Sequence, residues 1–141
     1  MTQDTILPGF VYLVGAGPGD PRYITLRAAE CLEQADVVLY DFLANPLILQ
    51  HVRFDARRIC LGRHGVGKLW TQQEINAEMV RLAQQGLKVV RLKGGDPAIF
   101  ARCAEETHAL TLHNIDYEVV PGITAAMAAG SCVGVPLTHR D

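Results

Sequence analysis

Short apolar runs separated by helical patterns extend along almost the whole chain of 141 residues. The runs typical of buried strands lie at residues 11–14, 37–40, 58–61, 89–92 and 117–120. Helix start signals or helical spacing of apolar residues lie at 25–34, from 46, at 71–85, at 97–112 and after 122. This alternation predicts an α/β fold, a doubly wound and mostly parallel sheet of about five strands flanked by helices. The length predicts one domain, residues 1–141.

Capping residues mark two of the predicted helix starts. Thr71 and Glu74 have the spacing of a capping box, in which each side chain binds the other residue's free backbone amide. Asn45 followed by Pro46 is typical of an N-cap with proline at the first helical position. Gly86 is expected to end the helix that begins after Thr71.

Glycine-bearing loops follow three of the predicted strands, at residues 15–21, 94–97 and 121–124. In an open parallel sheet, ligands bind beyond the carboxyl ends of the strands. Glycine has no side chain, so a ligand or another backbone segment can approach it closely. One such loop is explained by a simple strand-to-helix turn, but three of them at the same edge predict a ligand site.

Composition limits the classes of partner. Hydrophobic residues make up 49% and charged residues 20%, the balance of a globular protein, and a formal net charge of −2 provides no electrostatic footprint for nucleic acid or an anionic membrane. The four cysteines form no Cys-x-x-Cys pair and the histidines have no ligand spacing, so no metal site is expected. No signal segment or membrane-length apolar run is visible, and we expect a cytoplasmic protein.

The first glycine loop departs from the dinucleotide-binding fingerprint. It reads Gly15-x-Gly17-x-Gly19, and Asp20 occupies the position of the last fingerprint glycine. Pro18 removes a backbone N–H from the loop, and Asp20 places a negative charge near an expected pyrophosphate. One feature favours the dinucleotide alternative, because Asp41, after the second strand, lies near where an acid would bind the ribose. The loop therefore favours a ligand without phosphates, such as S-adenosylmethionine, over a nicotinamide or flavin dinucleotide.

Four stretches carry a family resemblance, at residues 11–21, 90–100, 120–126 and 136–141. They read VYLVGAGPGDP, VRLKGGDPAIF, VPGITAA and PLTHRD. In order and spacing they resemble the signature motifs of the tetrapyrrole methylases. Several long motifs in register are much more specific than one glycine loop. Within the family, they are most similar to the motifs of enzymes that methylate uroporphyrinogen III.

This resemblance implies a cofactor, a reaction and a set of cofactor contacts. The cofactor would be S-adenosylmethionine, leaving S-adenosylhomocysteine, and the reaction would convert uroporphyrinogen III to precorrin-2 for siroheme and cobalamin synthesis. The family's cofactor contacts correspond here to Pro18, Gly94, Gly95, Asp96, Ile99, Thr124 and Ala125. Asp96 would face a cationic part of the cofactor, although it also suits a helix cap ahead of Pro97. Ile99 would line the adenosine.

The resemblance also implies two catalytic residues, Asp41 and Arg63. Adding a methyl group to a pyrrole carbon requires that a proton leave, and Asp41 corresponds to the family's proposed acceptor. The family's proton donor is a lysine, but this chain has Arg63 there. Arginine stays charged and is a poor acid. Arg63 is therefore either a contact for a substrate carboxylate or a solvated charge, and Arg102 is a second candidate carboxylate contact.

Relatives with these motifs continue into a second α/β domain, which would complete the cofactor pocket. We therefore expect the chain to supply the N-terminal part of an active site, to be inactive alone, and to belong to a homodimer when complete. Two alternatives remain open. One is a non-catalytic module that keeps the methylase fold, and the other is a sister methylase acting on another precorrin, on diphthine or on ribosomal RNA.

Overall fold

A computed structural model describes residue 7 and residues 9–62 and 67–140. Its centre is a five-stranded sheet in which every strand pairing is parallel, in the order β3-β2-β4-β1-β5. The strands are β1 (Phe10–Gly15), β2 (Val37–Tyr40), β3 (Arg57–Cys60), β4 (Lys88–Lys93) and β5 (Asp116–Val120). The α-helices are α1 (Leu26–Gln34), α2 (Gln72–Gln84), α3 (Cys103–Leu112) and α4 (Ala125–Val133), and two 3-10 helices are η1 (Pro21–Tyr23) and η2 (Pro46–His51). The predicted parallel α/β fold is confirmed.

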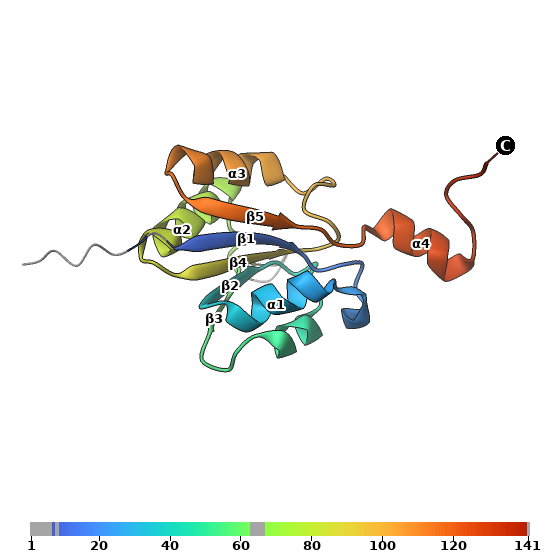
Figure 1. Cartoon of the computed structure of the whole chain (residues 1–141), viewed down its shortest axis with the longest axis horizontal. Helices are drawn as coiled ribbons and strands as arrows, with labels where there is room; N and C mark the ends of the chain where they lie inside the picture. Colours follow the sequence, from blue (N-terminus) through green and yellow to red (C-terminus); the bar gives the residue numbers. More distant parts are fainter. Residues whose placement is uncertain (1–6, 8, 63–66, 141) are drawn as a thin grey trace, which may run out of the picture.

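Helices cover both faces of the sheet, with α1 and η2 on one face and α2 and α3 on the other (Figure 1). The alternation of side chains along β1 divides the core accordingly. Tyr12 and Val14 pack with α1, whereas Val11 and Leu13 pack with α2 and α3. All four of these side chains are buried. Strands buried on both faces read as nearly continuous apolar runs, which is why they were recognisable in the sequence.

The strand order places a topological switch point between β1 and β4. These neighbours are hydrogen-bonded, but the chain leaves β1 toward α1 and leaves β4 toward α3, on the opposite face. Ligands of open α/β sheets bind at such a point, outside the carboxyl ends of the strands. The dinucleotide-binding order has β1 beside β2, whereas here β4 separates them. The topology therefore argues against the dinucleotide alternative.

Two predicted helices differ from the observed ones. The helix expected from residue 97 begins only at Cys103, because Phe100 and Arg102 adopt left-handed backbone conformations with φ of 49° and 52°. A helix cannot continue through such residues. The segment after Asn45 does begin at Pro46 with an Asn45 cap, but it forms a 3-10 helix. The loop at 97–102 is consequently longer than expected and extends beside the sheet's carboxyl edge.

The capping box at the start of α2 is confirmed. The Thr71 hydroxyl accepts from the Glu74 amide at 3.2 Å, and the Glu74 carboxylate accepts from the Thr71 amide at 2.8 Å. Lys68 also donates to Glu74 at 2.7 Å. These contacts, that of Lys68 first, lower the pKa of Glu74 to about 2. The box fixes the helix entry and so places Gln72, the first residue of α2, at the carboxyl edge of the sheet.

We expect the contribution of Glu74 to stability to depend on pH. Because its pKa in the folded chain is about 2, below the ordinary glutamate value of about 4.3, the contribution is present above the ordinary pKa and is lost as pH falls toward about 2. Glu74→Gln should therefore unfold at lower urea concentration than wild type near neutral pH. The difference between the two urea midpoints should be smaller at about pH 3. An equal difference at both pH values would refute this role of the charge.

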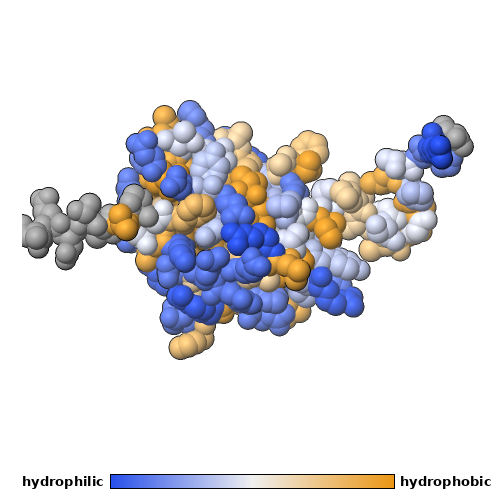
Figure 2. All heavy atoms as spheres, viewed as in Figure 1, coloured by the Kyte–Doolittle hydropathy of each residue, from blue (hydrophilic) through white to orange (hydrophobic). Residues whose placement is uncertain are grey.

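Helix α4 and residues 134–140 extend away from the sheet as an arm (Figure 1). Gly134, with φ of 69°, ends α4 in the left-handed conformation that glycine favours. The arm exposes several large apolar side chains, namely Met127, Val133, Val135 and Leu137. Figure 2 shows the arm coloured mainly white to orange, with hydrophilic residues toward its end.

Candidate active site

A cavity of about 460 Å³ lies at the carboxyl edge of the sheet, at the switch point between β1 and β4. Strands β1, β2, β4 and β5 each have their carboxyl end or the following loop in the wall. The lining residues are Gly17, Pro18, Asp41, Leu43, Gln72, Arg91, Lys93, Gly94, Gly95, Asp96, Ile99, Phe100, Ala101, Arg102, Thr124 and Ala125. The three glycine loops predicted to form a ligand site therefore do come together around one cavity.

The three loops are packed backbone against backbone. Gly17 and Gly95 form an antiparallel bridge, in which the amide of each donates to the carbonyl of the other at 3.1 and 2.8 Å. A Cβ on Gly122 would lie only 2.2 Å from the Gly95 carbonyl oxygen, and one on Gly15 would lie 2.7 Å from Gly122. Real Cβ atoms do not approach so closely. Glycine at these positions is required for the loops to meet.

Gly95 was expected to offer its backbone to a ligand, but its amide is already bonded to Gly17. Its contribution is therefore geometric. It has φ of 66°, which glycine adopts at little cost, and the nearest atom to an added Cβ would be the Thr124 Cα at 3.8 Å. Thr124 also lines the cavity. Gly95 thus keeps a part of the cavity wall free of side chain.

Asp96 joins the second and third loops. Its two carboxylate oxygens accept from the Ala98 amide at 2.8 Å and from the Gly122 amide at 2.9 Å. The expected cap ahead of Pro97 takes the form of a turn, because no helix begins there. Asp96 lines the cavity while it holds these loops together. Its negative charge therefore stays at a fixed place in the wall.

Asp41 follows β2 directly and reaches the cavity from the strand beside β4. Its Oδ1 accepts from the Leu43 amide at 3.0 Å, which closes a tight turn. Its Oδ2 lies 3.5 and 3.4 Å from the two terminal nitrogens of Arg91. About a quarter of the side chain is exposed, at 23%. Asp41 is thus an oriented carboxylate at the edge of a buried charge cluster.

That cluster contains the most buried charges among the described residues, and sequence reasoning missed it. Glu106 on α3 is fully buried and accepts from three side chains, Arg91 at 3.2 Å, Lys93 at 2.6 Å and Gln72 at 3.3 Å. Arg91 and Lys93 on β4 are only 5% and 4% exposed. Burial lowers the pKa of Lys93 below the ordinary lysine value, although Glu106 opposes the shift. Arg91, Lys93 and Gln72 of this cluster line the cavity.

A signal for this cluster was present in the sequence. Val89 of β4 packs on the face of α2 and α3, and Arg91 and Lys93 are the next two residues on that face. Two cations inside an otherwise apolar strand require a buried carboxylate nearby. Glu106 in the following helix supplies it.

The cavity brings together most of the expected site residues, because all the expected cofactor contacts and Asp41 line it. Arg63 lies outside the described residues. Arg102 lies at the rim, where it pairs with Glu105 at 2.7 Å. The residues that sequence reasoning did not assign to the site are Gly17, Leu43, Gln72, Arg91, Lys93, Phe100 and Ala101.

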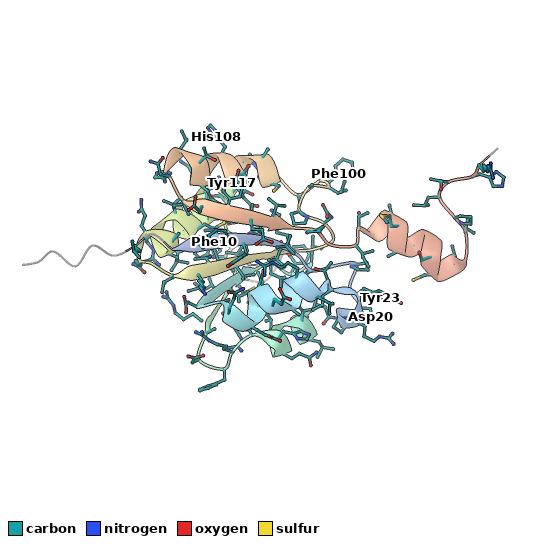
Figure 3. The ribbon with its side chains drawn as sticks, in the orientation of Figure 1. Phe10, Asp20, Tyr23, Phe100, His108 and Tyr117 are labelled. Atoms are coloured by element: carbon teal, nitrogen blue, oxygen red, sulfur yellow. The ribbon has the colours of Figure 1, made fainter. Side chains whose placement is uncertain are left out.

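The loop between β4 and α3 forms an exposed side of the cavity. Figure 3 shows Phe100 at this loop, pointing away from the sheet, and its side chain is fully exposed. Ile99 is about half exposed beside it. Asp20, by contrast, lies beside η1 with Tyr23 (Figure 3) and pairs with Arg22 at 2.6 Å. Asp20 does not line the cavity, so the expectation that its charge occupies the place of a pyrophosphate is wrong.

Among residue 7 and residues 9–62 and 67–140, no group of three or more His, Cys, Asp or Glu side chains is arranged to hold a metal ion. None of the helices formed by residues 9–62 and 67–140 is long and apolar enough to cross a membrane.

Comparison with known proteins agrees with the motifs. The chain is 54% identical over 134 residues to a siroheme synthase of Pseudomonas fluorescens, covering 95% of this chain and 29% of that protein. It is 50% identical to a siroheme synthase of Zymomonas mobilis, covering 100% of this chain and 30% of that protein. The chain therefore spans less than a third of the length of these curated relatives.

Solved structures are similar over slightly more than half of their length. Uroporphyrin-III C-methyltransferase from Thermus thermophilus superposes with a TM-score of 0.83 at 44% identity, covering 95% of this chain and 56% of that one. The same enzyme complexed with S-adenosylhomocysteine gives a TM-score of 0.78, covering 94% and 54%. The family profile of the Tetrapyrrole (Corrin/Porphyrin) Methylases matches residues 11–141. The chain belongs to the tetrapyrrole methylase family.

Proposed function

We propose that this chain forms the N-terminal part of the active site of an S-adenosylmethionine-dependent uroporphyrinogen-III C-methyltransferase. The reaction adds methyl groups to two pyrrole carbons and yields precorrin-2, a precursor of siroheme. The observation that carries the proposal is the meeting of three glycine loops and Asp41 around one cavity. The similar enzyme of Thermus thermophilus, whose structure contains S-adenosylhomocysteine, supports the choice of cofactor.

The cavity fits the chemical groups of S-adenosylmethionine. Helix α4 begins at the cavity wall, and the side chain of its cap, Thr124, makes no capping hydrogen bond. The positive end of a helix suits the carboxylate of the methionine part. Asp96 places a fixed negative charge nearby for the ammonium or sulfonium group, and Ile99 offers apolar surface to the adenosine. When bound, the cofactor supplies an electrophilic methyl group.

The chain's own contribution to the chemistry is proton removal. Transfer of a methyl cation to a substituted pyrrole carbon leaves a positive charge on the tetrapyrrole, and loss of a proton from another position of the molecule neutralises it. Asp41 is the partly exposed carboxylate of the cavity that is held by Arg91 and the Leu43 amide, and we assign it as the acceptor. Arg102 at the open rim is suited to a substrate carboxylate. Arg63 remains a candidate contact of the same kind.

The relation to the longer relatives supports a two-domain enzyme. The solved methyltransferases are almost twice as long as this chain, and the arm of α4 and residues 134–140 exposes apolar side chains. We propose that a second domain covers this arm and completes the cavity, and that the complete enzyme is a homodimer. A sister methylase acting on another precorrin is the second candidate, because a cobalt-precorrin-4 methyltransferase also superposes, with a TM-score of 0.81 at 32% identity.

The cofactor assignment leads to a direct binding prediction. In isothermal titration calorimetry, S-adenosylhomocysteine should bind the complete enzyme and should bind this chain alone much more weakly, because contacts from a second domain are missing. NAD should bind neither. The chain alone should not methylate uroporphyrinogen III. Saturable binding of NAD without any response to S-adenosylhomocysteine would contradict the assignment.

A further inference from the structure

We propose that Arg91, held in place by the buried carboxylate of Glu106, is a positioning residue that fixes the Asp41 carboxylate for proton removal. The inference rests on the proposed function, because it assigns Arg91 a role in the step performed by Asp41. The charge cluster of Arg91, Lys93 and Glu106 includes none of the expected cofactor contacts.

The guanidinium of Arg91 is held from three directions. Its Nε donates to Glu106 Oε1 at 3.2 Å, and one terminal nitrogen donates to the Leu92 carbonyl at 3.0 Å. Both terminal nitrogens face the same oxygen of Asp41, at 3.5 and 3.4 Å. The planar, five-donor guanidinium can contact two carboxylates at once, whereas an ammonium on a flexible stem has no such second edge. Arg91 thus links Glu106 on α3 to Asp41 at the end of β2 and fixes their relative positions.

Lys93 leaves the charge of Arg91 available for Asp41. Glu106 is a single negative charge between two cations, with Lys93 Nζ on its second oxygen at 2.6 Å. The three residues together carry one net positive charge, and Asp41 balances it. Gln72 donates to Glu106 as well and so fixes it from α2. Every buried side-chain nitrogen and oxygen of the described residues has at least one hydrogen-bond partner, so no such atom of the cluster is left unpaired.

Stability alone gives a poor reason for this arrangement. Burying ionic groups in a strand costs desolvation that their mutual attraction does not reliably exceed, and well-packed apolar residues are often as good. The two cations of the cluster, Arg91 and Lys93, also line the cavity. Asp41 is held on Oδ1 by the Leu43 amide and on Oδ2 by Arg91, so its carboxylate plane is fixed from two sides. Proton transfer requires such fixed geometry.

Arg91→Lys tests the inference because it keeps the buried positive charge but removes the planar guanidinium that contacts Glu106 and Asp41 at the same time. In the complete enzyme, kcat for uroporphyrinogen III should fall at least about tenfold, whereas the affinity for S-adenosylhomocysteine should change less than about twofold. The matched control is Arg81→Lys, the same substitution in a surface pair of α2 with Glu78, which should change neither quantity. A parallel loss of kcat and of binding in Arg91→Lys would indicate a structural role and overturn the inference.

A double-mutant cycle with Asp41→Asn separates positioning from independent effects. If Arg91 acts through Asp41, Arg91→Lys should change kcat less than about twofold in the Asp41→Asn background. An equal loss in both backgrounds would overturn the inference. If the wild-type enzyme does not methylate uroporphyrinogen III, the proposed function is wrong. The contact between Arg91 and Asp41 is then tested separately by NMR. Arg91→Lys should shift the Leu43 amide signal, which reports the bond to Asp41, and an unmoved signal would overturn the inference.

Discussion

Replacing Asp41 with asparagine should lower the turnover of uroporphyrinogen III by the complete enzyme about 10²–10⁴-fold, the usual contribution of a general base. Asparagine keeps an oxygen for the Leu43 amide but cannot accept a proton. The affinity for S-adenosylhomocysteine should stay within a few-fold of wild type, because Asp41 is assigned to the substrate and not to the cofactor. Steady-state kinetics and calorimetry on the same preparation measure both quantities.

Asp55→Asn is a suitable control for this experiment. It makes the same chemical change at an exposed carboxylate that pairs with Arg53 outside the cavity, and it should leave turnover unchanged. If Asp41→Asn retains turnover within a few-fold of wild type, the proton acceptor is another group. Asp41 would then be a turn-forming residue that balances the charge of Arg91.

Adding a single methyl group at Gly95 should abolish measurable binding of S-adenosylhomocysteine while the chain stays folded. In Gly95→Ala the new Cβ has room within the protein, since its nearest neighbour is the Thr124 Cα at 3.8 Å. It would nevertheless stand in the cavity wall where the three loops meet. The positive φ adds a backbone cost of about 1–2 kcal/mol, which lowers the unfolding temperature but leaves the fold intact. Calorimetry and thermal unfolding measure the two effects separately.

Gly67→Ala provides a control matched in backbone conformation. Gly67 has φ of 69°, close to the 66° of Gly95, and no described atom lies within 4 Å of an added Cβ. This variant should lose a similar amount of stability and keep its affinity for S-adenosylhomocysteine. Equal affinity in both variants would mean that Gly95 does not face the cofactor, and that the cavity wall at this loop has another use.

The sheet and the cavity were predictable because backbone rules govern them. Strands buried on both faces appear as continuous apolar runs, and their carboxyl ends lie at one edge whatever the strand order. The position of the ligand loops therefore followed from the glycine turns alone. The order β3-β2-β4-β1-β5 did not follow, because it depends on which strands pair across long separations in sequence. That order is what separates this fold from the dinucleotide-binding one.

The parts that sequence reasoning missed depend on tertiary contacts. Helix propensity does not predict that Phe100 and Arg102 adopt positive φ values, which is why α3 begins only at Cys103. The roles of Asp96 and Gly95 differ from expectation for the same reason, since their partners are loops that approach only in the folded chain. The Glu106 cluster links α2, α3 and β4; the cations of β4 indicate that a buried carboxylate lies nearby, but only the folded chain identifies it as Glu106.

We expect the complete enzyme to transfer methyl groups from S-adenosylmethionine to uroporphyrinogen III. Mass spectrometry of the tetrapyrrole, after incubation of the enzyme with both compounds, measures this transfer. The product should carry two additional methyl groups and form with the release of S-adenosylhomocysteine, and Asp41→Asn should give no product over the same time. Unchanged uroporphyrinogen III, in a preparation that methylates another precorrin, would contradict the claim and favour the sister activity.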